Sequence, residues 1–277
     1  MRNIRRNIRH LAANVVRTVY PKLYFKGKLE RLSRAFHEPE LHYLPYLCDK
    51  KKISIDIGAS EGIFSSHLIK YSSRCIAFEP RPKQAAQLQQ IFSLSAVSAS
   101  VEPVALSDRA GETVLRVLTK DPGRSTIDDA NPLEDKDGSS QEEIRVPVST
   151  LDQYQLADVG FIKIDVEGHE ISVLRGGNQT IAKSRPYLLI EIEDRHHENA
   201  IREVSEFLRA LDYSGFFMKE NQLNTLEQFS RDIDQNPDNI GGWVDGWKRK
   251  GIYINNFFFV PNEKVGTFVE NVKRMTP

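Results

Sequence analysis

An α/β domain with a mainly parallel sheet, covered by helices on both faces, is the fold class that this sequence predicts. From residue 51 onward, short apolar runs such as SIDIG (54–58) alternate with segments of helical periodicity. Such alternation is typical of βαβ units, whose parallel strands are buried on both faces. The 277 residues, 40% hydrophobic and 27% charged, suffice for one such domain and its core. We therefore expect one domain over residues 37–277, preceded by a basic helical extension over residues 1–36.

The expected elements follow in a regular order. Apolar runs predict strands over 51–58, 73–80, 97–107, 111–119, 161–168, 185–194, 213–218 and 253–261. Helical patterns predict helices over 61–71 and 81–94, one with Ile171, Leu174 and Ile181 on a face, and one with Ile201, Val204, Leu208 and Leu211. The run 111–119 alternates like an antiparallel strand. The polar segments 120–143 and 219–252, the second with Trp243 and Trp247, are predicted to be surface excursions or lids over an acceptor.

The first 20 residues form an amphipathic helical pattern. Apolar residues recur at three and four positions, and arginines fall on the opposite side: Ile4, Ile8, Leu11, Val15 and Val19 against Arg2, Arg5, Arg6 and Arg9. Residues 1–36 hold ten Arg or Lys and one acid, Glu30. One interpretation is a helix on an anionic membrane surface, or against a partner such as a second copy. The other is a helix whose stripe packs on its own domain. Pro21 is expected to end it.

Composition excludes several classes of protein. Net charge is zero, so the chain as a whole gives no electrostatic reason to expect nucleic acid as a partner. Two cysteines, Cys48 and Cys75, are too few for a disulfide framework, which indicates a reducing compartment. No apolar run reaches the roughly 18 residues of a membrane span, and the basic N-terminus lacks the apolar core of a signal peptide. We expect a cytoplasmic protein, with peripheral contact at the inner face of the membrane as an extension of that hypothesis.

The stretch SIDIGASEGIF (54–64) carries the first functional signal. Gly58 and Gly62 let the backbone approach a ligand, and the helix that starts near Glu61 offers free N–H groups. The spacing G-A-S-E-G is not the G-x-G-x-x-G of dinucleotide sites, so the turn alone is weak evidence. Glu79 ends the next strand, 21 residues after Gly58, where an acid can accept both hydroxyls of a ribose. With Asp56 inside the first strand, this pattern suits S-adenosylmethionine, a nucleoside with a cationic tail, better than a pyrophosphate.

Six segments in order resemble the FkbM family of S-adenosylmethionine-dependent O-methyltransferases. They are IDIGASEGIFS, AFEP, VALSDRAGE, VSTLDQY, FIKIDVEGHEISVLRGG and RPYLLIEIE, and the resemblance covers about residues 50–260. It implies a class I methyltransferase fold, Rossmann-like, with seven strands of which the last is antiparallel; NNFFFVP matches that strand. The N-terminal helix and the segment 219–252 depart from the family pattern, and acceptor contacts commonly come from such additions.

The resemblance also implies roles for single residues. Gly58, Ala59, Ser60 and Gly62 would surround the methionine part of the cofactor, beside the helix start at Glu61, with Asp56 ordering the turn. Glu79 would hold the ribose. Ala105 and Leu106 would flank the adenine.

Candidate catalytic groups follow the strand over 161–168. Methyl transfer to an aliphatic hydroxyl needs a base or a metal ion, because the free hydroxyl is a poor nucleophile. Asp165 stands at the carboxyl end of that strand, and His169, which titrates near neutrality, follows it as a candidate base or as a structural histidine. On the next strand Glu193 and Asp194 follow Glu191. Asp165, Glu193 and Asp194 could meet as oxygen ligands of Mg²⁺, or simply face solvent and basic side chains.

The sequence therefore predicts a methyltransferase that uses S-adenosylmethionine to modify a hydroxyl of a small molecule or glycan, with a lipid-linked saccharide as one candidate. Asp165, His169 and Glu193 are its candidate catalytic residues. Two alternatives remain: a catalytically inactive methyltransferase-like scaffold, and an NAD-dependent oxidoreductase, which would require the absent G-x-G-x-x-G.

Overall fold

The computed structural model describes residues 16–35, 38–121, 123–133, 140–240, 242–243, 247–248 and 250–275. Most of the predicted helix over 1–20 lies outside the described residues, as do the side chains of Trp243 and Trp247, for which a lid was predicted. The backbone of the two tryptophans forms a short antiparallel ladder, β12 (Gly242–Trp243) and β13 (Trp247–Lys248).

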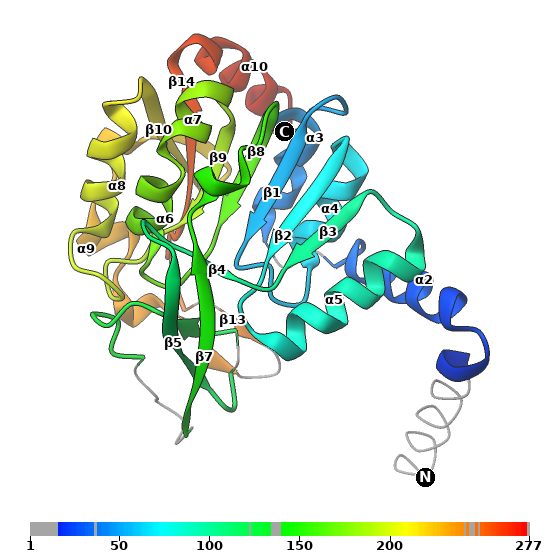
Figure 1. Ribbon diagram of the computed structural model, residues 1–277. Helices are drawn as coiled ribbons and strands as arrows, with labels where there is room; N and C mark the ends of the chain where they lie inside the picture. Colours follow the sequence, from blue (N-terminus) through cyan, green and yellow to red (C-terminus); the bar gives the residue numbers. More distant parts are fainter. Residues whose placement is uncertain are drawn as a thin grey trace.

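A large sheet forms the centre of the molecule (Figure 1). Among the described residues it has eight strands, in the order β11-β10-β14-β9-β8-β1-β2-β3. Their bounds are β1 Ile53–Ile57, β2 Arg74–Phe78, β3 Ala99–Glu102, β8 Val159–Ile164, β9 Tyr187–Glu191, β10 Tyr213–Lys219, β11 Gln222–Thr225 and β14 Asn256–Pro261. Strands β1, β2, β3, β8 and β9 are parallel, and β14 is antiparallel to both β9 and β10. The class I methyltransferase arrangement is therefore confirmed, including the antiparallel last strand.

The strand count differs from seven because a hairpin extends the sheet at one edge. Strand β10 continues to Lys219, and the turn at Glu220 and Asn221, both at positive φ, returns the chain as β11. The polar segment after residue 219 is therefore not entirely a surface excursion.

A second, smaller sheet was not predicted. Its order is β4-β7-β5-β6, with β4 Ala105–Leu106, β5 Gly111–Leu118, β6 Ser125–Thr126 and β7 Gln141–Ser149. The prediction of one strand over 97–107 is wrong, because the chain leaves the large sheet after Glu102, where Pro103 lacks the N–H that a ladder needs. The antiparallel character of 111–119 is confirmed by its pairing with β7. Strand β7 was missed since its residues alternate with exposed charges.

Helices cover both faces of the large sheet (Figure 1), as predicted. They are α2 Pro21–Leu32, α3 Leu44–Leu47, α4 Ile63–Tyr71, α5 Pro82–Ser95, α6 Glu170–Gly176, α7 Asn178–Ser184, α8 Ala200–Arg209, α9 Arg231–Asp234 and α10 Val265–Met275. The helical turn over residues 16–19 ends before Tyr20, which is not helical, so the first helix stops at Pro21 as predicted. Pro21 then begins a second helix, α2, where its fixed φ and missing N–H suit the first helical position. Within the described residues, no helix is long and apolar enough to cross a bilayer.

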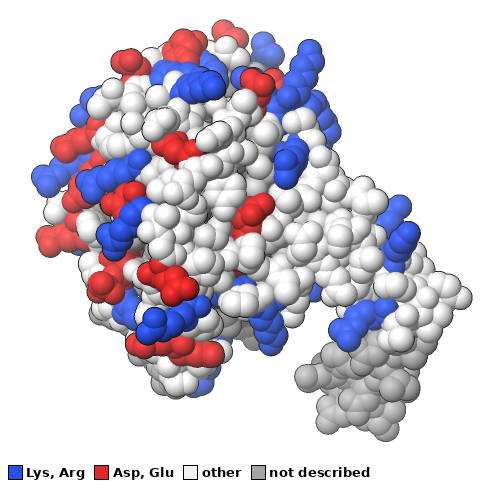
Figure 2. All heavy atoms as spheres, in the orientation of Figure 1, with Lys and Arg blue, Asp and Glu red and all other residues white. Residues whose placement is uncertain are grey.

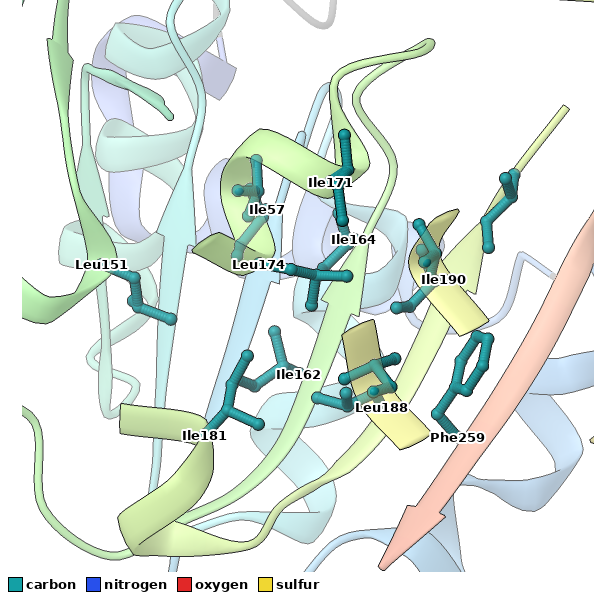
Figure 3. Close-up of a cluster of buried hydrophobic side chains, with 14 of the residues drawn as sticks. Ile57, Leu151, Ile162, Ile164, Ile171, Leu174, Ile181, Leu188, Ile190 and Phe259 are labelled. Atoms are coloured by element: carbon teal, nitrogen blue, oxygen red, sulfur yellow. The ribbon is translucent and has the colours of Figure 1, made fainter. Parts of the chain in front are cut away.

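Two apolar layers hold the helices on the sheet. On one face, Ile57, Ile162, Ile164, Leu188 and Ile190 of the strands pack against α6, α7 and α8 (Figure 3). On the other face, α3, α4 and α10 pack over β8, β9 and β14, while α2 and α5 cover β2 and β3. Close packing of aliphatic side chains on both faces fixes the parallel strands relative to one another. The carboxyl ends of these strands, where the site lies, are fixed with them.

Candidate active site

A cavity of about 280 Å³ lies beyond the carboxyl ends of β1, β2 and β8. This is where ligands bind in open α/β sheets. Both sheets line it. The large sheet supplies Ile57, Phe78, Glu79, Asp165 and Glu191, and the smaller sheet with its flanks supplies Val104, Ala105, Leu106, Leu115, Thr126 and Ile127.

The turn after β1 brings the backbone to the cavity. Gly58 has φ +84°, and a Cβ there would lie 1.8 Å from the carbonyl oxygen of Asp165, so a side chain is excluded. Gly58 and Ser60 line the cavity. Of the other residues predicted for the methionine part, Ala59 packs in the apolar cluster under α5. Glu61 lines a neighbouring cavity, and Gly62 is the N-cap of α4, where a Cβ would meet Leu88.

Asp56 lies under the turn rather than in the cavity. It is buried, and the Ser65 hydroxyl on α4 donates a hydrogen bond of 2.5 Å to its Oδ2 atom. Burial raises the pKa of Asp56 to about 6, although the Ser65 bond and the nearby Lys163 oppose that shift. The contact joins β1 to the first turn of α4, which is how Asp56 can order the turn between them.

Glu79 lines the cavity at the end of β2, but its carboxylate is already fully hydrogen-bonded. Oε1 accepts from the backbone N–H and the Nε of Arg81, each at 2.8 Å. Oε2 accepts from the backbone N–H of Ser60 at 2.7 Å and from Nη2 of Arg81 at 3.0 Å. Four donors fill the four lone-pair positions of a carboxylate. A ribose diol can therefore reach Glu79 only where the Arg81 guanidinium gives way.

An apolar wall faces the Glu79 side of the cavity. Ala105 and Leu106 are buried and line it, together with Phe78 and Ile127. Apolar side chains and a carboxylate in one cavity have the chemistry of a nucleoside site, because the base packs on the apolar side chains while the sugar meets the acid. The residues present therefore fit the cofactor that the sequence predicts.

A buried lysine lies beside two of the carboxylates that line the cavity. Lys163 on β8 is opposite Asp56 in the ladder with β1, and its side chain is 1% exposed. Its Nζ lies 3.3 Å from Oδ1 of Asn256, 3.7 Å from Oε2 of Glu191 and 4.0 Å from Oδ2 of Asp165. Burial opposes the charge, but the surrounding carboxylates outweigh it and raise the pKa of Lys163, so the lysine stays protonated.

Asp165 and Glu191 are the two carboxylates that this lysine holds at the cavity wall. Burial raises the pKa of Asp165 to about 7, although Lys163 opposes the shift. Burial and the neighbouring Asp165 raise the pKa of Glu191 well above its ordinary value. Two carboxylates beside one ammonium cannot both ionise easily, so the pair holds a proton near neutrality.

His169 also lines the cavity, and both of its ring nitrogens have polar neighbours. Nε2 lies 2.9 Å from the Ser107 hydroxyl, and Nδ1 lies 3.4 Å from Oδ2 of Asp128. Burial acts to raise the pKa of Asp128, but its contacts with His169 and the N–H of Ala130 outweigh burial and lower it. His169 thereby ties the smaller sheet to the start of α6.

Glu193 and Asp194 do not join Asp165. Strand β9 ends at Glu191, two residues before Glu193. Glu193 is buried in an ion pair with Arg195, 2.5 Å from Nε to Oε2, and also accepts from the Tyr253 hydroxyl. Asp194 accepts from the N–H of Ile201 and faces Arg231 at 3.6 Å.

The structure does not support the predicted magnesium site. In the described ranges there is no group of three or more His, Cys, Asp or Glu side chains that could hold a metal ion. The three proposed ligands are divided between the cavity wall and two separate ion pairs, because the chain turns away from the sheet after Glu191.

Sequence reasoning missed three residues of this site. Arg81 gave no signal beyond its position two residues after Glu79. Lys163 did give one, since a lysine inside the apolar run FIKID must be buried and therefore paired. Glu191 was named only as the residue that precedes Glu193 on the same strand. Because β9 ends at Glu191, that residue lines the cavity and Glu193 does not.

The model of a family described as the methyltransferase FkbM domain matches residues 56–214, more than half of the chain. Among solved structures, an FkbM methyltransferase from Methylobacillus flagellatus KT is similar at 14% identity with a TM-score of 0.48. The match covers 89% of this chain and 60% of that protein.

Two further solved structures illustrate the breadth of the likeness. A putative methyltransferase from Streptococcus mutans, SMU.1697c in complex with SAH, is 12% identical over 69% of this chain and 94% of that one, with a TM-score of 0.42. An rRNA methylase from Streptococcus thermophilus is 12% identical over 81% and 96%, also with a TM-score of 0.42. No curated protein matches the chain significantly.

Proposed function

The chain belongs to the FkbM methyltransferase family, and we propose that it uses S-adenosylmethionine to methylate a hydroxyl group of a small molecule or glycan. The observation that carries the proposal is one cavity lined by two chemically distinct groups of residues. One group is Glu79 with the apolar side chains of Ala105 and Leu106; the other is Asp165 and Glu191, which flank Lys163. The first group suits a nucleoside, and the second suits removal of a proton.

The cofactor, when bound, supplies a methyl group on a sulfonium that leaves readily. The chain's own residues then have two tasks: to align the acceptor oxygen and to take its proton. We assign the role of general base, the group that takes this proton, to Asp165. Its carboxylate lines the cavity, and its pKa of about 7 lets it accept a proton near neutrality. Lys163 keeps both carboxylates in place because it is buried between them and permanently charged.

Ribose binding is assigned to Glu79. The diol would take the two acceptor positions that the side chain of Arg81 fills, while the N–H groups of Ser60 and Arg81 keep theirs. Exchange of two guanidinium bonds for two hydroxyl bonds leaves the carboxylate satisfied. The guanidinium of Arg81, whose side chain is only 5% exposed, has to move to other partners or to solvent when the ribose binds.

The test is calorimetric titration with S-adenosylhomocysteine. Glu79→Ala should weaken binding at least tenfold, because the ribose loses its acceptor. The matched control is Glu102→Ala, a carboxylate at the end of the adjacent strand β3 that is not among the residues that line the cavity. Equal effects of the two substitutions would contradict the assignment. The acceptor is then sought by transfer of a labelled methyl group from S-adenosylmethionine to a panel of glycans and small-molecule alcohols.

A further inference from the structure

A basic arm projects from the domain on the side of α5. We use that name for residues 16–35, which comprise a helical turn before Tyr20 and helix α2. Figure 1 shows the arm extending past α5 and away from the sheet. The inner side of α2 is fixed to the domain, since Phe25 is buried in the apolar cluster with α5 and Leu29 and Leu32 pack against that cluster.

The outer side of the arm is apolar and exposed. Val19, Tyr20 and Leu23 are 58%, 63% and 66% exposed, the largest such group of neighbouring apolar side chains among the described residues. Leu23 precedes buried Phe25 by two positions, which is about 200° around a helix of 3.6 residues per turn. The two side chains therefore point in opposite directions, and the domain cannot cover Leu23.

Cations surround this apolar side. Arg17, Lys22 and Lys26 are all exposed, and the first turn of α2 has no acidic residue to balance the positive end of the helix. The whole arm has six basic residues, Arg17, Lys22, Lys26, Lys28, Arg31 and Arg34, against the single acid Glu30. In the view of Figure 2, the projecting part of the arm shows Lys and Arg among uncharged atoms.

The N-terminal part of the chain and the domain carry net charges of opposite sign. Residues 1–35 hold ten Arg or Lys and one acid, and the net charge of the chain is zero, so residues 36–277 hold nine more acidic than basic residues. An anionic surface attracts the N-terminal part and repels the domain. Two copies meeting arm to arm would instead bring like charges together, which disfavours self-association through this side.

We propose that the arm docks on an anionic lipid bilayer, with Val19, Tyr20 and Leu23 in the interface and Arg17, Lys22 and Lys26 against the lipid phosphates. Apolar side chains ringed by cations are the composition that binds such interfaces. The arm also forms part of the site's surroundings. Lys28 and Leu32 line a second cavity, of about 480 Å³, which shares Ser60 and Arg81 with the cavity of the candidate active site. Docking therefore places the catalytic domain at the membrane surface through an element that adjoins its site.

The experiment is flotation of the full-length protein with vesicles of phosphatidylcholine alone or with 30–40% phosphatidylglycerol, a range chosen on the order of natural anionic membranes. The intact protein should float with the anionic vesicles and not with the neutral ones, and binding should fall as salt rises. Leu23→Ser and the pair Lys22→Glu with Lys26→Glu should each reduce the bound fraction at least fivefold. The readout is lipid binding, so it is independent of whether methyl transfer occurs.

Matched controls use exposed residues outside the arm. Ile233→Ser removes an apolar side chain that is 62% exposed, and Lys183→Glu reverses an exposed charge in the last turn of α7; neither should change binding. The proposal is overturned if the intact protein ignores anionic vesicles, or if the arm variants bind as the controls do. It is also overturned if sedimentation without lipid shows a dimer that Leu23→Ser dissociates, because the apolar side would then be a subunit interface.

Discussion

A single carboxylate, that of Asp165, is the group on which the proposed chemistry depends. Asp165→Asn keeps the size and polarity of the side chain but cannot accept the proton. We expect kcat to fall by about 10²–10⁴-fold, the usual contribution of a positioned base. The affinity for S-adenosylhomocysteine should change by less than about threefold, since ribose binding is assigned to Glu79. A comparable loss of cofactor affinity would show that Asp165 binds the donor instead.

The pH dependence of that reaction has a definite sign. The pKa of Asp165 is raised to about 7 by burial, and the base is active only when deprotonated. The rate at saturating substrate should therefore rise as pH increases from 5.5 to 8 and level off above the pKa of the complex. A rate that is flat across this range would contradict the role of Asp165 as base.

Arg81 competes with the cofactor for Glu79. Its side chain supplies two of the four hydrogen bonds to the carboxylate. Arg81→Leu should leave those positions open to the ribose, so S-adenosylhomocysteine should bind several-fold more tightly by calorimetry. Tenfold weaker binding would mean that the guanidinium itself contacts the cofactor.

His196 gives a prediction about stability rather than catalysis. Its Nε2 lies 2.9 Å from Glu167 and 3.5 Å from Glu193. Burial opposes protonation, and so does the buried Asn131 amide, whose Nδ2 lies 2.9 Å from Nδ1 of His196. The two carboxylates outweigh both effects and raise the pKa of His196 to about 9. Because the folded pKa exceeds the unfolded value of about 6.5, protonated His196 stabilises the fold fully below pH 6.5, and this contribution is lost as pH rises through 9.

The free energy of unfolding should accordingly fall by up to about 3 kcal/mol between pH 6 and pH 9.5, because the pKa of about 9 in the folded state lies above the unfolded value of about 6.5. Urea titrations at the two pH values measure this difference. The His196→Gln variant should have a lower free energy of unfolding at pH 6 than the parent protein. Its free energy of unfolding should also change much less between pH 6 and pH 9.5. If the free energy of unfolding of the variant depends on pH as strongly as that of the parent protein, a group other than His196 causes the pH dependence.

At the scale of elements, the predicted site depended on where strands end. The sequence placed β1, β2, β8 and β9 correctly, because buried parallel strands read as short continuous apolar runs, whereas apolar residues in helices recur every three or four positions. It also placed Gly58, Glu79 and Asp165 at the cavity. It failed at Glu193, since RPYLLIEIED continues to alternate beyond Glu191 where the strand stops. Long-range partners such as Tyr253, 60 positions away from Glu193, leave no local signal.

The strand-to-helix turn after β1 gives a prediction at the same scale. Gly58→Ala puts a Cβ within 1.8 Å of the Asp165 carbonyl at positive φ, so β1 and β8 cannot keep their spacing. We expect a loss of about 1–3 kcal/mol in stability and no measurable cofactor binding. Gly27→Ala is the control: it lies inside α2 with nothing within 4 Å, and should stabilise by up to about 1 kcal/mol through helix propensity. Similar losses for both would point to a general intolerance of alanine.

At the scale of the whole molecule, the cavity joins two sheets that the sequence did not separate. Residues of the large sheet and of the smaller sheet line it together. A ligand there should stabilise both as one unit, by RT ln(1 + [L]/Kd), or about 2.7 kcal/mol at a concentration a hundred times Kd. For a chain of this size the melting temperature should rise by about 5–10 °C. Scanning calorimetry with S-adenosylhomocysteine measures this as one peak that moves as a whole, and Glu79→Ala should abolish the shift. Two peaks of which one stays in place would show that the smaller sheet unfolds independently, and the cavity would then have to be assigned to the large sheet alone.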